Sequence, residues 1–199
     1  MHEYCYDEMQ RFRDNYLLSL NKDCIDILDI GSQNINGTFK ELFNRDNWSY
    51  TGLDIEDGDN VDFIPINNYF WDEIKSNSYD VVISGQVFEH TEFFWLSILE
   101  IARVLKCGGL VCIISPSSGF EHRYPVDCYR FYRDGMSAIA KFARLEIIET
   151  KTNFEVSESY KDGSHHWQDS TLIGQKKKLT FKERLLLNLH RKLARRVWT

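Results

Sequence analysis

The sequence predicts an α/β protein built on a doubly wound, seven-stranded, mostly parallel sheet with helices on both faces. Short apolar runs rich in β-branched residues alternate along the chain with segments whose apolar side chains recur at helical spacing. The apolar runs lack the polar alternation of a strand with one face in water, which indicates a sheet buried on both faces. A basic amphipathic segment at the C-terminal end predicts one further helix outside this alternation.

The elements follow from periodicity and from turn residues. Helical spacing predicts helices over residues 3–20, 37–43, 68–76, 91–105, 135–142 and 180–198. Short apolar runs bounded by glycine or polar residues predict strands over residues 24–30, 50–55, 61–65, 79–84, 110–115, 145–151 and 170–175. We expect residues 1–178 to form one domain and residues 179–199 to form a separate basic helix.

Composition narrows the class of protein. A chain of 199 residues can bury a core without a metal or disulfides. The five cysteines are odd in number and form no Cys-x-x-Cys pair, which favours free thiols and predicts no metal site. The N-terminal segment is too polar for a signal peptide, and no apolar run approaches the roughly 20 residues that span a bilayer. We therefore expect a cytoplasmic protein.

The net charge of −6 conceals an asymmetry between the body and the tail. Residues 176–199 carry +8 and the remaining residues carry −14, so a long nucleic-acid footprint on the body is disfavoured. In the tail, apolar side chains recur every four residues, at Phe181, Leu185, Leu189, Leu193 and Val197. Two alternatives follow. Either this stripe packs on the protein's own sheet or on a second copy in a homodimer, or the helix makes peripheral contact with the inner membrane surface.

Glycine and acidic residues follow the first two predicted strands, at the edge where doubly wound sheets bind ligands. Gly31 lacks a side chain that would keep a ligand from the backbone. Asp54 ends the second strand, 25 residues after Asp29. In nucleotide-binding folds a carboxylate at this place accepts hydrogen bonds from ribose hydroxyls, although a solvated strand-end aspartate is the alternative.

Four segments in order resemble the class I S-adenosylmethionine-dependent methyltransferases: LDIGSQNINGTF, YTGLDIEDG, SYDVVISGQVFEH and LSILEIARVLKCGGLVCIISP. The resemblance extends over residues 23–176 and implies a Rossmann-like methyltransferase fold, S-adenosylmethionine as cofactor and methyl transfer as activity. The first loop departs from the family pattern, because Gln33 and Ile35 stand where glycines are usual.

The resemblance also implies which residues hold the cofactor. The first loop would take the methionine end, Asp54 the ribose, Ile55 the adenine ring and the loop after the fourth strand the sulfonium side. The residues expected to bind the cofactor are Asp29, Gly31, Ser32, Gly37, Asp54, Ile55, Asn67, Ser84 and Gln86. The pair Glu89-His90 is expected to position its loop, and a catalytic role is the alternative.

The loop over residues 116–133 is long for a structureless connection, which favours a functional role. His122 is the candidate general base, since imidazole commonly exchanges protons near neutral pH. The residues expected to bind the acceptor are Tyr124, Asp127, Tyr129, Arg130 and Tyr132. The alternative is that Asp127 and Arg130 pair to fix the loop, with the tyrosines as its packing.

The acceptor is expected to be a small polar molecule methylated on oxygen. An Asp/Asn-Pro-Pro-aromatic motif, which nucleobase N-methyltransferases of the family carry after the fourth strand, is absent. By analogy with compact members of the family, a sugar or sugar conjugate of surface-polysaccharide biosynthesis is the leading expectation. Two alternatives remain open: an RNA or protein methyltransferase that docks through the basic tail, and a non-catalytic module that binds the cofactor.

Overall fold

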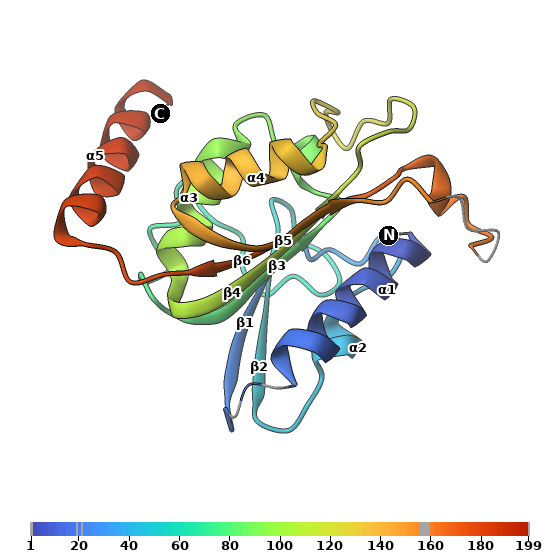
Figure 1. Ribbon diagram of the computed structural model, residues 1–199, viewed down its shortest axis with the longest axis horizontal. Helices are drawn as coiled ribbons and strands as arrows, with labels where there is room; N and C mark the ends of the chain where they lie inside the picture. Colours follow the sequence, from blue (N-terminus) through green and yellow to red (C-terminus); the bar gives the residue numbers. More distant parts are fainter. Residues whose placement is uncertain (1, 19, 21, 156–159, 199) are drawn as a thin grey trace.

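The computed structural model describes residues 2–18, 20, 22–155 and 160–198 and confirms the predicted α/β class (Figure 1). Its sheet has six strands in the order β2-β1-β3-β4-β6-β5. The first four in the chain pair in parallel, whereas β6 runs antiparallel to both of its neighbours. The strands are β1 (Ile25–Ile30), β2 (Trp48–Leu53), β3 (Tyr79–Gly85), β4 (Leu105–Ser115), β5 (Leu145–Thr152) and β6 (Ser170–Lys176).

Helices cover both faces of the sheet (Figure 1). This cover is required because the strands carry apolar side chains on both faces. One face carries α1 (Glu3–Phe12), which continues into a π-helical turn over Arg13–Leu17, and α2 (Lys40–Phe43). The other face carries α3 (Phe94–Val104) and α4 (Arg133–Phe142). The sheet therefore separates two hydrophobic clusters.

The predicted strand over residues 61–65 is wrong in extent: a single bridge between Leu53 and Phe63 stands in its place. The side chain of Asp62 accepts the backbone N–H of Gly52 at 2.8 Å. This N–H is therefore not available to a backbone carbonyl of a neighbouring strand. Pro65 has no N–H to continue a ladder. The sheet consequently ends at β2.

The predicted helix over residues 68–76 is also wrong, because turns occupy this segment. Side chains from α3 satisfy its backbone. Glu100 accepts the N–H of Trp71 at 3.0 Å, and the guanidinium of Arg103 donates to the carbonyls of Trp71 and Ile74, both at 2.6 Å. Because these tertiary hydrogen bonds replace the internal ones of a helix, helical spacing alone misjudged the segment.

The basic tail forms the predicted helix, α5 (Phe181–Trp198), which stands beside α3 at one end of the molecule (Figure 1). Thr180 and Glu183 form a capping box: Thr180 donates its backbone N–H to Glu183 at 2.9 Å, and Glu183 donates its own to the Thr180 hydroxyl at 3.3 Å. Among the described residues, no helix has the length and hydrophobicity needed to cross a bilayer.

Candidate functional site

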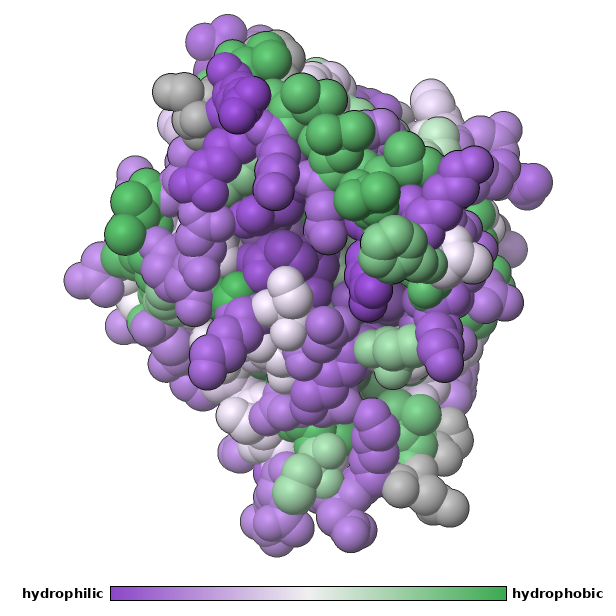
Figure 2. Space-filling model, turned by 90° about the vertical axis from the view of Figure 1, so that its left-hand side faces the viewer, coloured by the Kyte–Doolittle hydropathy of each residue, from purple (hydrophilic) through white to green (hydrophobic). Residues whose placement is uncertain are grey.

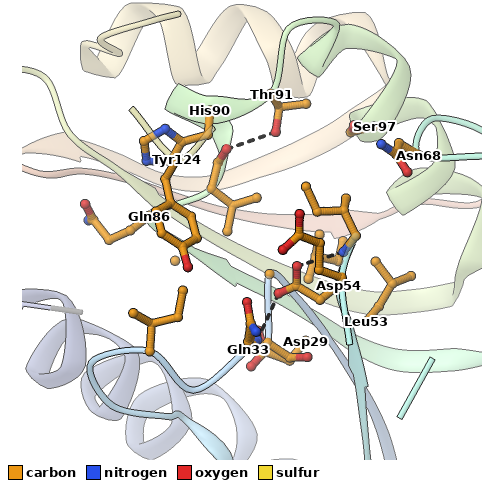
Figure 3. Close-up of a pocket in the computed structure, with 18 of the residues that line it drawn as sticks. Asp29, Gln33, Leu53, Asp54, Asn68, Gln86, His90, Thr91, Ser97 and Tyr124 are labelled. Atoms are coloured by element: carbon orange, nitrogen blue, oxygen red, sulfur yellow. Dashed lines mark hydrogen bonds between the residues drawn. The ribbon is translucent and has the colours of Figure 1, made fainter. Parts of the chain in front are cut away.

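A cavity of about 870 Å³ opens beyond the carboxyl ends of β1, β2 and β3, where a doubly wound sheet is expected to bind its ligand (Figure 3). Its volume lies within the usual range for small-molecule sites. In the close-up, Gln86, His90 and Tyr124 gather on one side and Leu53 and Asp54 on the other. Of the residues expected to bind the cofactor, those that line the cavity are Asp29, Gly31, Ser32, Gly37, Asp54, Ile55 and Gln86.

The first loop depends on the absence of a side chain at Gly31. This glycine has a φ of +77°, and an added Cβ would lie 2.1 Å from Cγ2 of Val87. The backbone amides of Gly31 and Ser32 both donate to the carbonyl of Leu53, at 2.8 and 3.2 Å. The chain therefore turns tightly against the end of β2 although two of the family's glycines are missing.

Asp29 lies beneath this loop with its carboxyl buried. Tyr50 donates its hydroxyl to Oδ2, whereas Oδ1 has no hydrogen-bond partner among the described residues. Burial raises the pKa of Asp29 to about 7, against the opposing effect of the Tyr50 hydrogen bond. The cavity thus holds an unsatisfied acceptor that a ligand donor would satisfy.

Asp54 is held in a fixed orientation at the end of β2. Its Oδ2 accepts the backbone N–H of Gln33 at 2.9 Å, and its Oδ1 accepts the N–H of Ile55 at 2.7 Å (Figure 3). Each carboxylate oxygen has a second lone pair, so both remain able to accept a hydrogen bond from a ligand. This geometry suits a pair of vicinal hydroxyls.

Two residues expected to bind the cofactor lie outside the cavity. Asn67 accepts the N–H of Tyr69 at 2.9 Å in a local turn, and its neighbour Asn68 lines the cavity instead. Ser84 is fully buried within the sheet and donates to the carbonyl of Ile30 at 3.2 Å. In both cases the expected residue is wrong by one or two positions, because the residues that line the cavity come one or two positions later in the chain.

Gln86 occupies a left-handed backbone conformation, with a φ of +60°, at the point where β3 leaves the sheet. Non-glycine residues seldom adopt this conformation, and it often accompanies function. The side-chain amide donates to buried Asp169 at 3.1 Å, while Oε1 has no partner within the described part of the chain. Asp169 was not foreseen, since nothing in the sequence brings it near residue 86.

His122 and Tyr124 reach the cavity from the long loop. The His122 ring lies 4.8 Å from that of His90 and 4.6 Å from that of Trp167, between centroids. Its backbone N–H donates to Oδ2 of Asp127 at 2.8 Å, and the same oxygen lies 3.5 Å from Nδ1 of His122. At that separation the two atoms form no hydrogen bond, and Nδ1 of His122 has no hydrogen-bond partner among the described residues.

The other loop residues expected to bind the acceptor do not line the cavity. Arg130 pairs with Asp127 through two nitrogens, at 2.5 and 2.8 Å, and also donates to the carbonyls of Ser118 and Phe120. The Arg130 hydrogen bond lowers the pKa of Asp127 to about 2. Tyr129 donates its hydroxyl to the carbonyl of Glu92 at 2.8 Å, and Tyr132 lies against Phe154. This arrangement matches the alternative in which the pair fixes the loop.

The fold also assembles a set of possible metal ligands that the chain order does not suggest. Glu89, His90 and His122 each place one ligand atom within 4.8 Å of the others. Oε2 of Glu89 accepts the Ser115 hydroxyl at 2.6 Å, Oε1 has no partner among the described residues, and burial raises the pKa of Glu89 to about 8. Nδ1 of His90 lies 2.5 Å from the carbonyl of Val126.

The sequence predicts no metal, and chelation tests this prediction. We expect turnover to stay unchanged after dialysis against EDTA, because Glu89 already accepts the Ser115 hydroxyl and His90 already contacts the Val126 carbonyl, which gives both side chains a structural role without an ion. The measurement is the initial rate of product formation before and after dialysis. A rate that falls and is restored by Zn²⁺, Mn²⁺ or Mg²⁺ would contradict the prediction and assign the cluster to a cation.

Comparison with known proteins finds a similarity to methyltransferases. A family model described as a methyltransferase domain matches residues 28–113, which contain the second half of β1, all of β2 and β3, and most of β4. No curated protein gives a significant match to the chain.

Solved methyltransferase structures share the fold. The CurJ carbon methyltransferase superposes with a TM-score of 0.65 at 14% identity over 87% of this chain, which spans only 54% of that protein. A SAM-dependent methyltransferase from Methanosarcina mazei gives 0.62 at 15%, covering 83% of this chain and 98% of the other. The Burkholderia thailandensis 1,6-didemethyltoxoflavin-N1-methyltransferase, solved with 1,6-didemethyltoxoflavin and S-adenosylhomocysteine, gives 0.66 at 12%, covering 88% and 80%.

The cavity fits S-adenosylmethionine. Asp54 presents two oriented oxygens, and Asp29 and Gln86 offer buried acceptors without partners among the described residues. The expected role of Gly31 is corrected, because Val87 occupies the place that a Cβ would take, so the glycine serves the turn and this packing. When bound, S-adenosylmethionine supplies an electrophilic methyl group. The matched family model contains the strand ends that build this cavity, and solved methyltransferase structures share the fold around them, so residues 28–113 are similar to a methyltransferase domain and the whole chain has the methyltransferase fold.

Proposed function

We propose that this chain is a class I S-adenosylmethionine-dependent methyltransferase that transfers the methyl group to an oxygen atom of a small polar acceptor, namely a sugar or sugar conjugate of surface-polysaccharide biosynthesis. The observation that carries the proposal is the position of His122, which lines the same cavity as Asp54 and Gln86. A hydroxyl acceptor must lose its proton during transfer, and an imidazole in the cavity is suited to accept it.

The shape of the site supports a small acceptor. One cavity of about 870 Å³ serves both the cofactor side and the side of His122. Tyr124 stands at its edge with 57% of its surface exposed, so an aromatic face is available to a polar ring. The methyltransferases of the comparison include carbon and nitrogen enzymes, so the oxygen acceptor rests on His122 alone.

A methyl-transfer screen tests the proposal. The purified chain is incubated with S-adenosylmethionine and nucleotide sugars, lipid-linked sugars, RNA or protein, and S-adenosylhomocysteine release is measured. We expect release with a sugar acceptor and, by mass spectrometry, a methyl group on oxygen. Transfer to RNA or protein alone would overturn the acceptor class. Tight cofactor binding without transfer to any class would favour the non-catalytic module.

The RNA or protein alternative has less support from the tail. Arg191 and Arg195 are already paired with Asp72, and Arg191 also with Glu100. Because these two arginines already form ion pairs within the protein, they contribute less to the binding of a nucleic acid than free cations would.

A further inference from the structure

Helix α5 is attached to the body through its basic face. Arg191 donates to Asp72 at 2.7 Å and also pairs with the buried Glu100 of α3. Arg195 pairs with the other oxygen of Asp72, and both guanidinium groups lie over the ring of Phe70, at 5.8 and 5.7 Å. Leu187 adds an apolar contact with the core. These bonds fix which side of the helix faces the protein.

The apolar stripe consequently faces away from the body. The exposed fractions are 73% for Phe181, 56% for Leu185, 49% for Leu189, 51% for Leu193 and 71% for Val197. The view onto the α5 side shows hydrophobic side chains gathered in a band bordered by hydrophilic ones (Figure 2). Packing of the stripe on the protein's own sheet, one of the sequence alternatives, is therefore wrong, since α1 to α4 already cover both faces of that sheet.

Cations accompany this stripe. Lys182, Lys192 and Arg196 are exposed, and at 3.6 residues per turn they project from the same half of the helix as the stripe. None of the described residues forms an ion pair with these three side chains. The one acidic residue of the helix, Glu183, belongs to the opposite half, where it pairs with Arg144 at 3.4 Å.

We propose that this outward face of α5, formed by the five stripe residues with Lys182, Lys192 and Arg196, binds the surface of an anionic membrane. Apolar side chains would enter the headgroup boundary while lysine and arginine reach back to phosphate groups. Docking by Arg191 and Arg195 already presents this face, so the helix need not leave the body to bind.

Charge favours a lipid surface over a second copy of the chain. A symmetric dimer through this face would bring the same three cations of each copy together across an apolar contact, which like-charge repulsion opposes. An anionic lipid surface instead neutralises them, and each contributes separately.

The attachment also links the membrane face to the active cavity. Phe70 and Asp72, which hold α5, alternate in the chain with Tyr69 and Trp71, which line the cavity. A membrane-bound enzyme would meet acceptors carried on lipids. This last consequence rests on the proposed function, whereas membrane binding itself does not.

Vesicle co-sedimentation of the full chain tests the proposal without any methyl-transfer assay. Vesicles of phosphatidylcholine with phosphatidylglycerol are compared with phosphatidylcholine alone, at low and at high salt. We expect binding to the anionic vesicles that weakens as salt rises. The triple variant Leu185→Gln, Leu189→Gln, Leu193→Gln should lose it, whereas Ile66→Gln, at a site 93% exposed elsewhere, should not.

The charge contribution is measured separately. Lys182→Gln, Lys192→Gln and Arg196→Gln should each lower the partition coefficient about fivefold, while Lys141→Gln on exposed α4 surface should leave it unchanged. All of these side chains are exposed, so circular dichroism should show intact folding. An intact chain that ignores anionic vesicles at low salt overturns the proposal. So does a dimer, seen by analytical ultracentrifugation, that the triple leucine variant converts to monomer. A negative acceptor screen bears only on the proposed function.

Discussion

Replacing His122 with alanine should lower turnover about a hundredfold or more, while cofactor affinity stays within twofold of the wild type. Loss of a positioned general base typically costs 10² to 10⁴ in rate, about this order for a hydroxyl acceptor. His122 lines the cavity from the long loop and contacts the ring of His90 edge to face, whereas Asp54 follows the end of β2. The loss of turnover should therefore occur without a loss of cofactor affinity.

The measurement is kcat with a sugar acceptor identified by the screen, together with calorimetric cofactor binding. His190→Ala is the matched control, because that histidine is exposed on α5 away from the cavity. A His122 variant whose kcat falls less than threefold would show that orientation of the acceptor carries the reaction without a base at this position. A parallel loss of cofactor affinity would indicate a structural effect of the loop.

Asp54→Ala should weaken binding of S-adenosylmethionine and S-adenosylhomocysteine at least tenfold, or about 1.4 kcal/mol. The backbone amides of Gln33 and Ile55 orient the carboxylate, so its loss removes two preorganised acceptors and leaves both amides without their partner. The effect should appear in Kd and leave the acceptor side of the cavity intact.

Calorimetry with each ligand measures this change. Asp57→Ala controls for the loss of one acidic residue in the same loop, since that residue is exposed and does not line the cavity. Asp54→Asn, which keeps one oxygen acceptor, should fall between the wild type and the alanine variant. Unchanged affinity in Asp54→Ala would remove Asp54 from the cofactor site.

The sequence alone determined the fold class and the edge of the sheet that binds the ligand. Uninterrupted apolar strands require cover on both faces, and the positions of Gly31 and Asp54 after their strands follow from chain order. These features depend on residues close together in the chain, so the periodicity and spacing of the sequence are enough to predict them. The same local signals also located α5 within a residue of its observed start.

Tertiary contacts decided the rest. Glu100 and Arg103 form hydrogen bonds with backbone groups of residues 68–76, in place of the internal hydrogen bonds of a helix. In the resulting turns, Asn68 rather than Asn67 lines the cavity. Asp169 reached Gln86 across 83 positions of the chain. In α5 the stripe was readable from spacing, but which face it turned outward depended on Asp72 and Glu100 binding its arginines. Such pairings join residues distant in the chain, so only the folded backbone could choose among them.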